Sequence, residues 1–324
     1  MEHNAKVAGD IELTEARAQY DAACKRLLSH KAFLAWILKS CLEEYKDSDI
    51  ETIMNRYIEG VPQVGQTAVD EDETNPSLAL AAGERVAGLN TEHRTVTEGT
   101  VTYDIRFLAL APRDGTLMRI IVNVEAQSRY DPGYPLVKRG IYYASRMISA
   151  QKGVEFQGSE YGKIKKVCSI WICMNAPRER QGSITRYALR AEELVGAGAE
   201  TIKNYDLLSV VMLCLGDGES EAGGVLRMLE VLLSSERKAE EKIKILGEEY
   251  AIRMSEPEEK EVARMCNLSQ GLVEKGMAEG LEKGLEQGLE KGLEQGAFQA
   301  MLSSVKNLMA NVGMSAAQAM DVLE

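Results

Sequence analysis

Histidine is scarce in this sequence. The 324 residues include three, His3, His30 and His93, and they lie far apart. This spacing argues against a histidine-based metal site and against a Ser/His/Asp triad, because both need histidine beside the other reacting groups. The six cysteines include no Cys-x-x-Cys pair and stand among apolar residues, so neither structural zinc nor a disulfide framework is expected, and we interpret them as core residues. Any catalysis is therefore expected to rest on carboxylates.

Long apolar segments are also missing. No run of eighteen apolar residues occurs, and the N-terminal residues are polar, without an apolar signal region. These absences predict a cytoplasmic protein with no membrane partner. With 45% hydrophobic and 27% charged residues, the composition is that of a globular chain with a sizeable core and room for two domains.

Two apolar runs in residues 101–129 each carry an acid, Asp104 in the first and Glu125 in the second. Apolar residues alternate along both runs, a period that is typical of half-buried strands. The PRDG sequence between them is a turn signal, so the two runs are predicted to form a hairpin. A buried carboxylate is costly unless it is paired, hydrogen-bonded or bound to a metal, so both acids need an explanation.

The predicted register of this hairpin brings the two acids together. With Arg113 and Asp114 at the centre of the turn, Asp104 lies opposite Asn123 and diagonal to Glu125 on one polar face. Two converging carboxylates are the hard oxygen ligands that Mg²⁺ prefers, and they leave coordination positions open for water and a phosphate. A solvated hairpin face with ordinary acids explains the same residues equally well.

A basic segment follows the two acids. The net charge of the chain is −12, which on average disfavours a nucleic-acid partner, but residues 128–190 hold twelve Lys and Arg against four acids. Cations that position a phosphodiester backbone beside a carboxylate metal site would fit a nucleic-acid substrate, and a solvated basic surface is the alternative. Within this segment Arg139, Tyr142 and Arg146 share one face of a predicted helix and are candidates for phosphate contacts, with snorkelling over the core as the alternative.

The N-terminal third is predicted to be helical and then irregular. Apolar spacing predicts two successive helices in residues 14–46, broken near His30. Residues 48–51, from a serine to a glutamate, fit a capping box that opens a shorter helix ending near Gly60. Residues 61–100 contain prolines, glycines and an acidic run, so we expect a long, partly irregular connection there.

The remaining elements predict a mixed α/β architecture. β-branched and aromatic residues predict buried strands in residues 163–175 and 205–216, and the chain is expected to be helical from about residue 217 onward. This order of helices and strands indicates an α/β or mixed α+β sheet with flanking helices. The helix in residues 137–152 is expected to bury one apolar face, formed by Val137, Ile141, Ala144 and Ile148.

Glycine recurs every four residues from Gly276 to Gly296 in GMAEGLEKGLEQGLEKGLEQG. On a helix of about 3.6 residues per turn, this glycine stripe winds slowly around the rod. Each interior Gly costs about 1 kcal/mol relative to Ala, so the helix is marginal by itself. Close approach of a second helix along the glycine stripe would offset that cost and make the chain a homo-oligomer, and a flexible spacer is the alternative.

Four short sequences together carry a family resemblance. YDAACKRLL in the first helical segment, YDIRF and VNVEAQ in the hairpin, and KRGIYYASR in the next helix resemble the PD-(D/E)xK nuclease superfamily. Within it, the chain is most similar to the recombination-promoting nuclease and transposase family. The likeness extends over roughly residues 15–324, because that family often carries a Gly-Leu-Glu repeat near its C-terminus.

The resemblance implies a restriction-endonuclease-like core and a Mg²⁺-dependent DNA endonuclease with Asp104 and Glu125 as metal ligands. Gln127 stands where the superfamily has lysine; the family itself commonly has glutamine there, which hydrogen-bonds without supplying a positive charge. Asp21 matches the acid on the family's first helix, which would help to hold metal or water. An exposed i,i+4 ion pair between Asp21 and Lys25 is the alternative for this residue.

These observations predict three parts and two functional hypotheses. The parts are a nuclease-like domain in residues 1–216, a helical region in residues 217–270, and the Gly-Leu-Glu repeat with a C-terminal helix in residues 271–324. The first hypothesis is a metal-dependent DNA endonuclease of a transposase or recombination-promoting type. The second is a catalytically inactive nucleic-acid-binding or assembly protein with the same fold.

Overall fold

The computed structural model describes residues 2–65, 92–95, 99–113, 116–128, 130–216 and 224–323. It confirms the predicted mixed α/β class, with a six-stranded sheet in the order β1-β4-β5-β6-β8-β7 and flanking helices. The chain divides into two compact units, Met1–Ser269 and Gln270–Glu324, and each is described by itself. Residues 224–269, which the sequence analysis set apart from the nuclease-like domain, belong to the first unit.

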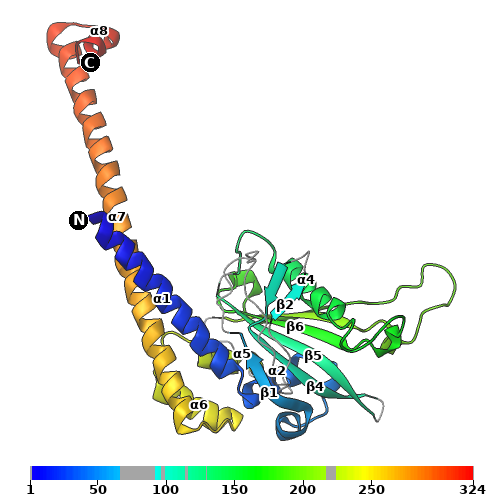
Figure 1. The fold of residues 1–324 in the computed structure, drawn as a ribbon. Helices are drawn as coiled ribbons and strands as arrows, with labels where there is room; N and C mark the ends of the chain where they lie inside the picture. Colours follow the sequence, from blue (N-terminus) through cyan, green and yellow to red (C-terminus); the bar gives the residue numbers. More distant parts are fainter. Residues whose placement is uncertain are drawn as a thin grey trace. The chain divides into compact units, whose positions relative to one another are not determined.

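The sheet combines antiparallel and parallel strands (Figure 1). β1, β4 and β5 pair antiparallel, β5, β6 and β8 run parallel, and β7 closes the far edge antiparallel to β8. Its strands are β1 (Ile58–Val64), β4 (Ile105–Arg113), β5 (Thr116–Gln127), β6 (Lys166–Cys173), β7 (Ser183–Ala188) and β8 (Leu208–Cys214). A separate antiparallel pair consists of β2 (Glu92–Thr95) and β3 (Gly99–Thr102).

The strand predictions are confirmed where the apolar signal is strong. The two buried strands expected in residues 163–175 and 205–216 are β6 and β8, and nearly every residue in them is buried. The irregular connection expected in residues 61–100 is wrong at both ends, because it contains most of β1, all of β2 and the first half of β3. Residues 66–91 lie outside the described residues.

The first helices are confirmed with adjusted ends. α1 (Glu2–Leu28) and α2 (Lys31–Cys41) are separated at His30, whose side chain caps α2 by accepting a hydrogen bond from Ala32 N–H at 3.3 Å. The capping box expected to begin at a serine is wrong, because the next residue, Asp49, is the N-cap and accepts a hydrogen bond from Thr52 N–H at 2.7 Å. Aspartate caps as well as serine does, and its spacing to Thr52 places the cap one residue later.

The helix that follows Asp49 is short and changes type. α3 (Ile50–Thr52) continues as a π-helical turn (Ile53–Tyr57), which ends where β1 begins rather than near Gly60. The described part of the first unit also contains three-residue 3₁₀ helices at Glu43–Tyr45, Tyr161–Lys163, Arg178–Arg180 and Ile202–Asn204.

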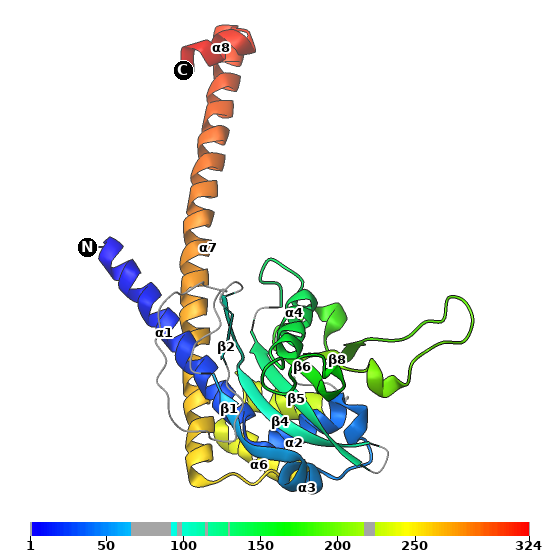
Figure 2. The same ribbon diagram turned by 45° about the vertical axis from the view of Figure 1, so that its right-hand side comes forward.

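α4 (Leu136–Ser149) covers one face of the sheet over β6 and β8 (Figure 2). The apolar face predicted for this helix is partly confirmed, because Ala144 is buried and Ile148 packs against the core. It is wrong in including Ile141, which is 44% exposed, and in omitting Gly140 and Tyr143, which are buried. The physical reason is a close approach: a Cβ on Gly140 would lie 2.6 Å from Val210 Cγ1. Because glycine has no side chain, α4 can pack closely against the sheet on the side that carries Gly140. The spacing of apolar residues does not identify this side.

The other face of the sheet carries the larger core. α2 and α5 (Val225–Leu233) pack there, together with the C-terminal half of α1, α6 (Ala239–Tyr250) and the start of α7 (Glu256–Val312). Figures 1 and 2 show α4 on one side of the sheet and α2 and α5 on the other. All six cysteines are buried and free, which confirms them as core residues.

The second unit consists of the rest of α7 and α8 (Ala316–Leu323). The glycine repeat lies within α7, so the predicted helix is confirmed. Its four repeat leucines, at positions 281, 285, 289 and 293, are 66–77% exposed. None of the helices that the structure describes is long and apolar enough to cross a membrane.

Candidate functional site

The β4–β5 hairpin positions the two acids, in a register that differs from the predicted one. Arg106 pairs with Asn123, which the sequence analysis placed opposite Asp104, so the predicted register is wrong by two residues. The ladder ends at the pair Ile105 and Val124, and just beyond it Asp104 N–H donates a hydrogen bond to Glu125 Oε1 at 3.2 Å. Because side chains alternate with a period of two, a shift of two residues keeps both acids on the same face. The turn itself, at residues 114–115, lies outside the described residues.

Asp104 occupies a bend rather than a strand. The continuous strand predicted from Val101 is wrong, because β3 ends at Thr102 and β4 begins at Ile105. The backbone carbonyl of Asp104 accepts a hydrogen bond from Gly65 N–H at 2.8 Å, which ties the bend to the end of β1. The regular strand is therefore interrupted at Asp104, the acid that lies beside Glu125.

The two carboxylates are buried, and each accepts a backbone hydrogen bond from the segment that carries the other. Asp104 is 3% exposed and Glu125 is 2% exposed. Glu125 Oε1 accepts hydrogen bonds from Asp104 N–H at 3.2 Å and from Asn123 Nδ2 at 2.9 Å, and Asp104 Oδ2 accepts one from Ala126 N–H at 2.9 Å. The alternative of a solvated hairpin face with ordinary acids is therefore wrong.

Lys25 joins the site from α1. Its ammonium nitrogen lies 2.8 Å from Asp104 Oδ1 and 2.6 Å from Asp21 Oδ2, and the lysine side chain is 2% exposed. The i,i+4 pair with Asp21 is present, but it is not an ordinary exposed pair, because Lys25 is buried and reaches across to Asp104. Asp21, at 30% exposure, thus lies at the rim of the site, linked to it through Lys25.

Burial and charge determine the protonation of the pair. Burial raises the pKa of Glu125 well above its ordinary value, and the neighbouring charge of Asp104 raises it further. Burial also raises the pKa of Asp104, although the Lys25 ammonium opposes that rise. Burial alone would lower the pKa of Lys25, but the charges of Asp104 and Asp21 outweigh it and raise that pKa. These directions favour the protonated form of Glu125 and the charged form of Lys25.

Gln127 and Arg139 flank the pair. Gln127 follows Glu125 by two residues on β5, so it shares the same face, and it is partly buried. Arg139 on α4 donates hydrogen bonds to Tyr143 Oη at 3.2 and 2.7 Å and to Tyr134 Oη at 3.1 Å. Its charge lowers the pKa of Glu125, against the larger effect of burial, so Arg139 acts on the site through its field.

The other two predicted nucleic-acid contacts on α4 differ in exposure. Tyr142 is 43% exposed, whereas Arg146 is 4% exposed and donates a hydrogen bond to Tyr142 Oη at 3.1 Å. The burial of Arg146 argues against direct contact between its guanidinium and a phosphate.

Part of the positive charge of the basic segment is neutralised locally. Lys166 is buried between Glu44 and Asp206, with nitrogen–oxygen distances of 2.6 and 2.7 Å. Lys163 and Lys165 also form ion pairs, with Glu160 and Glu155 respectively. The excess of Lys and Arg over acids in residues 128–190 therefore overstates the positive charge that the surface presents. Arg129, which is part of that count, lies outside the described residues.

The residues present fit a single divalent cation. Asp104 and Glu125 offer hard carboxylate oxygens, and the buried Asn123 Oδ1 beside them has no hydrogen-bond partner among the described residues. The Lys25 ammonium contacts two carboxylates, those of Asp104 and Asp21, so ionised Asp104 and Asp21 carry one more negative charge than the cation that touches them. Among the described residues, no group of three or more His, Cys, Asp and Glu side chains could hold a metal, so water and substrate would have to complete the coordination.

Sequence reasoning found the two acids and missed the roles of Lys25 and Asn123. The signal for Lys25 was its place among apolar residues of α1, four residues after an acid, which is a costly location for a lysine without a partner. The chain matches no protein-family model, no curated protein and no solved structure. The family resemblance therefore stays a prediction, and the functional argument rests on the geometry of the site.

Proposed function

We propose that this protein is a Mg²⁺-dependent DNA endonuclease of a recombination-promoting or transposase type, with Asp104 and Glu125 as metal ligands. The observation that carries the proposal is the meeting of two buried acids: Asp104 N–H donates a hydrogen bond to Glu125 Oε1, and Lys25 is the ammonium in contact with Asp104. A restriction-endonuclease-like core and a cytoplasmic location belong to the same proposal.

Each residue around the pair has a distinct task in this proposal. Asn123 Nδ2 fixes the orientation of Glu125, and Ala126 N–H fixes Asp104. Glu125 must lose its proton before it can bind a cation, so metal affinity should rise with pH through its raised pKa. Bound Mg²⁺ would supply Lewis-acid stabilisation of charge on the phosphate and would acidify an attacking water.

Lys25 supplies the positive charge that Gln127 cannot. Its ammonium group is held beside Asp104 by two acids, and their charges keep it protonated. A fixed cation near the phosphate stabilises negative charge that develops during cleavage. The amide of Gln127, on the same strand face as Glu125, would orient the attacking water by hydrogen bonding.

DNA would approach along the face that carries α4. Arg139 and the exposed Tyr142 lie on this helix, and the rest of the basic segment supplies contacts to phosphates. Affinity that comes from such contacts falls steeply as salt rises, because each neutralised phosphate releases counterions.

The contact between Lys25 and Asp104 favours a second candidate function. The ammonium already occupies Asp104 Oδ1 at 2.8 Å, so the acid is satisfied without any metal. A protein that kept this ion pair for stability alone would be an inactive nucleic-acid-binding or assembly protein.

Supercoiled plasmid nicking with and without Mg²⁺ tests the proposal. The isosteric variants Asp104→Asn and Glu125→Gln should lose Mg²⁺-dependent nicking and keep both fold and DNA affinity, because they remove charge without changing shape. Asp47→Asn, at an exposed acid, is the matched control and should nick at the wild-type rate.

Two results would contradict the proposal. If both site variants cut at the wild-type rate, the carboxylates are not the metal ligands. If the wild-type chain binds DNA in a salt-dependent way, shows no heat of Mg²⁺ binding by calorimetry and never nicks, the second candidate replaces the first.

A further inference from the structure

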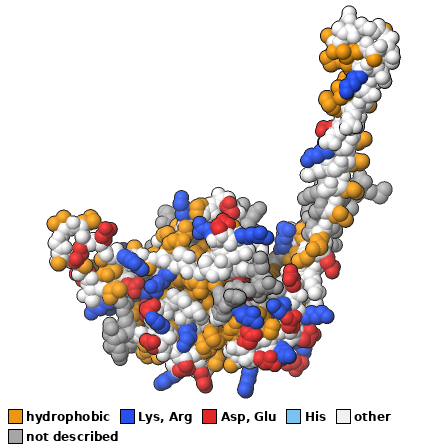
Figure 3. All heavy atoms as spheres, turned by 180° about the vertical axis from the view of Figure 1, so that it is seen from behind, with side chains coloured by type: hydrophobic (Ala, Val, Ile, Leu, Met, Phe, Trp, Pro, Cys, Tyr) orange, Lys and Arg blue, Asp and Glu red, His pale blue; other side chains and the backbone are white. Residues whose placement is uncertain are grey.

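A projecting loop connects β7 to the short helix before β8. All residues from 189 to 201 are exposed, and Figures 1 and 2 show this segment extending away from the sheet. Leu194 is 84% exposed and Val195 is 96% exposed. Figure 3, which shows the opposite side, has hydrophobic side chains gathered on the same loop. Adjacent apolar side chains held out in water in this way are typical of interaction sites.

Hydrogen bonds shape the tip of the loop. Glu193 Oε1 accepts hydrogen bonds from Gly198 N–H and Ala199 N–H, both at 3.0 Å, which closes the turn. Nearer the end of the loop, Glu200 Oε2 accepts one from Asn204 Nδ2 at 2.8 Å. The tip is therefore preorganised, and a preorganised loop loses less conformational entropy when it binds.

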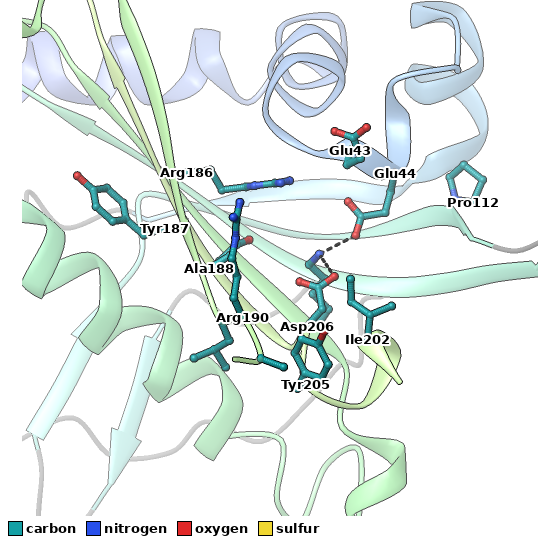
Figure 4. Close-up of a pocket in the computed structure, with 14 residues that line it drawn as sticks. Glu43, Glu44, Pro112, Arg186, Tyr187, Ala188, Arg190, Ile202, Tyr205 and Asp206 are labelled. Atoms are coloured by element: carbon teal, nitrogen blue, oxygen red, sulfur yellow. Dashed lines mark hydrogen bonds and ion pairs between the residues drawn. The ribbon is translucent and has the colours of Figure 1, made fainter. Parts of the chain in front are cut away.

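A pocket of about 930 Å³ lies at the base of this loop (Figure 4). Its lining combines apolar side chains, among them Pro112, Leu189 and Ile202, with two arginines, Arg186 and Arg190. Three acids, Glu43, Glu44 and Asp206, also line it. Figure 4 shows both arginine side chains extending into the pocket. The buried Lys166 ammonium, by contrast, is already held by Glu44 and Asp206 and is not offered to a ligand.

We propose that a second copy of this chain docks at this pocket. Leu194 and Val195 of one copy enter the pocket of the other, and the reciprocal contact forms about a two-fold axis. Residues 189–191 line the pocket and also begin the loop. When the loops of two copies lie antiparallel, the tip of each loop therefore reaches the pocket at the base of the loop in the other copy. One self-complementary patch then makes both contacts, as closed two-fold symmetry requires.

The charges of the loop and the pocket match this occupant. Residues 191–200 carry three acids and no Lys or Arg. In the pocket, Glu44 and Asp206 pair with Lys166, and Glu43 pairs with Lys46. Among the described residues, Arg186 and Arg190 are therefore the lining charges left without an ion pair, and they are what the pocket offers to the acids of the loop. Glu192 stands immediately before the structured tip, where it would meet the arginines of the partner copy. A loop with this charge is a poor ligand for DNA, which needs cations.

Sedimentation equilibrium on the full chain provides the first test. Leu194→Asp should weaken dimerisation by roughly 10- to 100-fold, because a large apolar side chain is lost from the buried contact. Val154→Asp, at a valine that is 79% exposed outside this surface, is the matched control and should leave dimerisation unchanged. Glu192→Arg alone and Arg190→Glu alone should each weaken it, and the double exchange should restore it.

Cross-linking shows where the copies meet. A tagged chain carrying Leu194→Cys is mixed with an untagged chain carrying Ile202→Cys and treated with a short bis-maleimide. We expect a tagged–untagged product, which is lost when Arg190→Glu is added to the untagged chain.

Three outcomes would overturn the proposal. One is a monomeric wild-type chain at all concentrations tested. Another is a dimer that survives Leu194→Asp and forms no cross-link, which would place self-association on another surface such as the glycine repeat. The third is a Leu194→Asp variant that loses DNA affinity while its dimerisation is unchanged, which would make the loop a nucleic-acid contact.

Discussion

Replacing Lys25 with methionine tests the central ion pair of the site. Methionine preserves the unbranched shape of the side chain and removes its charge, so Asp104 keeps its burial and loses its cation. Asp21 is 30% exposed and can be solvated, whereas Asp104, at 3% exposure, cannot. The perturbation therefore isolates the cost of leaving one buried carboxylate without a partner.

The magnitude follows from the burial of Asp104. Removing one partner of a buried ion pair costs about 3–5 kcal/mol of unfolding free energy. A domain of this size loses about 2–4 °C of melting temperature for each kcal/mol, so Lys25→Met should lower Tm by roughly 6–20 °C. Because a native domain has only about 5–15 kcal/mol of stability in total, this loss is large without preventing folding at low temperature.

The effect should depend on pH with a defined sign. Loss of Lys25 raises the pKa of Asp104 further, so the variant folded state binds a proton that the wild type releases. The difference in Tm should therefore narrow as pH falls through the raised pKa of Asp104 in the variant. At high pH the wild type keeps its advantage until Lys25 itself loses its proton, because the folded protein raises that pKa.

Thermal denaturation followed by circular dichroism measures these effects. The control is the double variant Lys25→Met with Asp104→Asn, in which no buried charge is left alone, and it should recover most of the lost stability. A loss below about 1 kcal/mol for Lys25→Met, or a double variant with the summed losses of the single variants, would refute the reasoning about this pair.

Three further predictions concern the neighbouring residues. Glu125→Gln should stabilise the metal-free protein increasingly as pH rises through the raised pKa of Glu125, because the wild type loses stability there; melting curves across pH check this. Gln127→Ala should lower the cleavage rate without weakening Mg²⁺ binding, and Gln127→Lys should retain or raise it, as rates against Mg²⁺ concentration would show. Gly140→Ala should cost about 1–3 kcal/mol in urea unfolding, because its Cβ would lie 2.6 Å from Val210 Cγ1; an unchanged midpoint would contradict the close approach of α4.

Part of the site was predictable because alternation is a local property. Each β-strand places every second side chain on one face, so Asp104 and Glu125 share a face for any register that shifts by two residues. The prediction therefore survived a wrong turn centre. The strong apolar runs of β6 and β8 and the break near His30 are local in the same way, and the structure confirms them.

The features that the sequence did not reveal depend on segments far apart in the chain. Lys25 and Asp104 are separated by 79 positions, and only the packing of α1 against the sheet makes their contact visible. The buried side of α4 depends on where Gly140 contacts the sheet. Most residues of the edge strand β7 are exposed, so its sequence carries only a weak apolar signal for a strand. Likewise, the sequence shows the exposed Leu194 only as an apolar residue in a loop.

By itself, the sequence determined the types of the main elements, the helical repeat and the shared face of the two acids, since these follow from periods within one segment. Only the tertiary structure decided the register of the hairpin, the burial of the carboxylates and the lysine that pairs with Asp104. The physical reason is that burial and ion pairing arise when separate segments remove water from one another. The sequence of a single strand or helix indicates which side chains lie on each of its faces, but the fold determines which of those side chains come into contact.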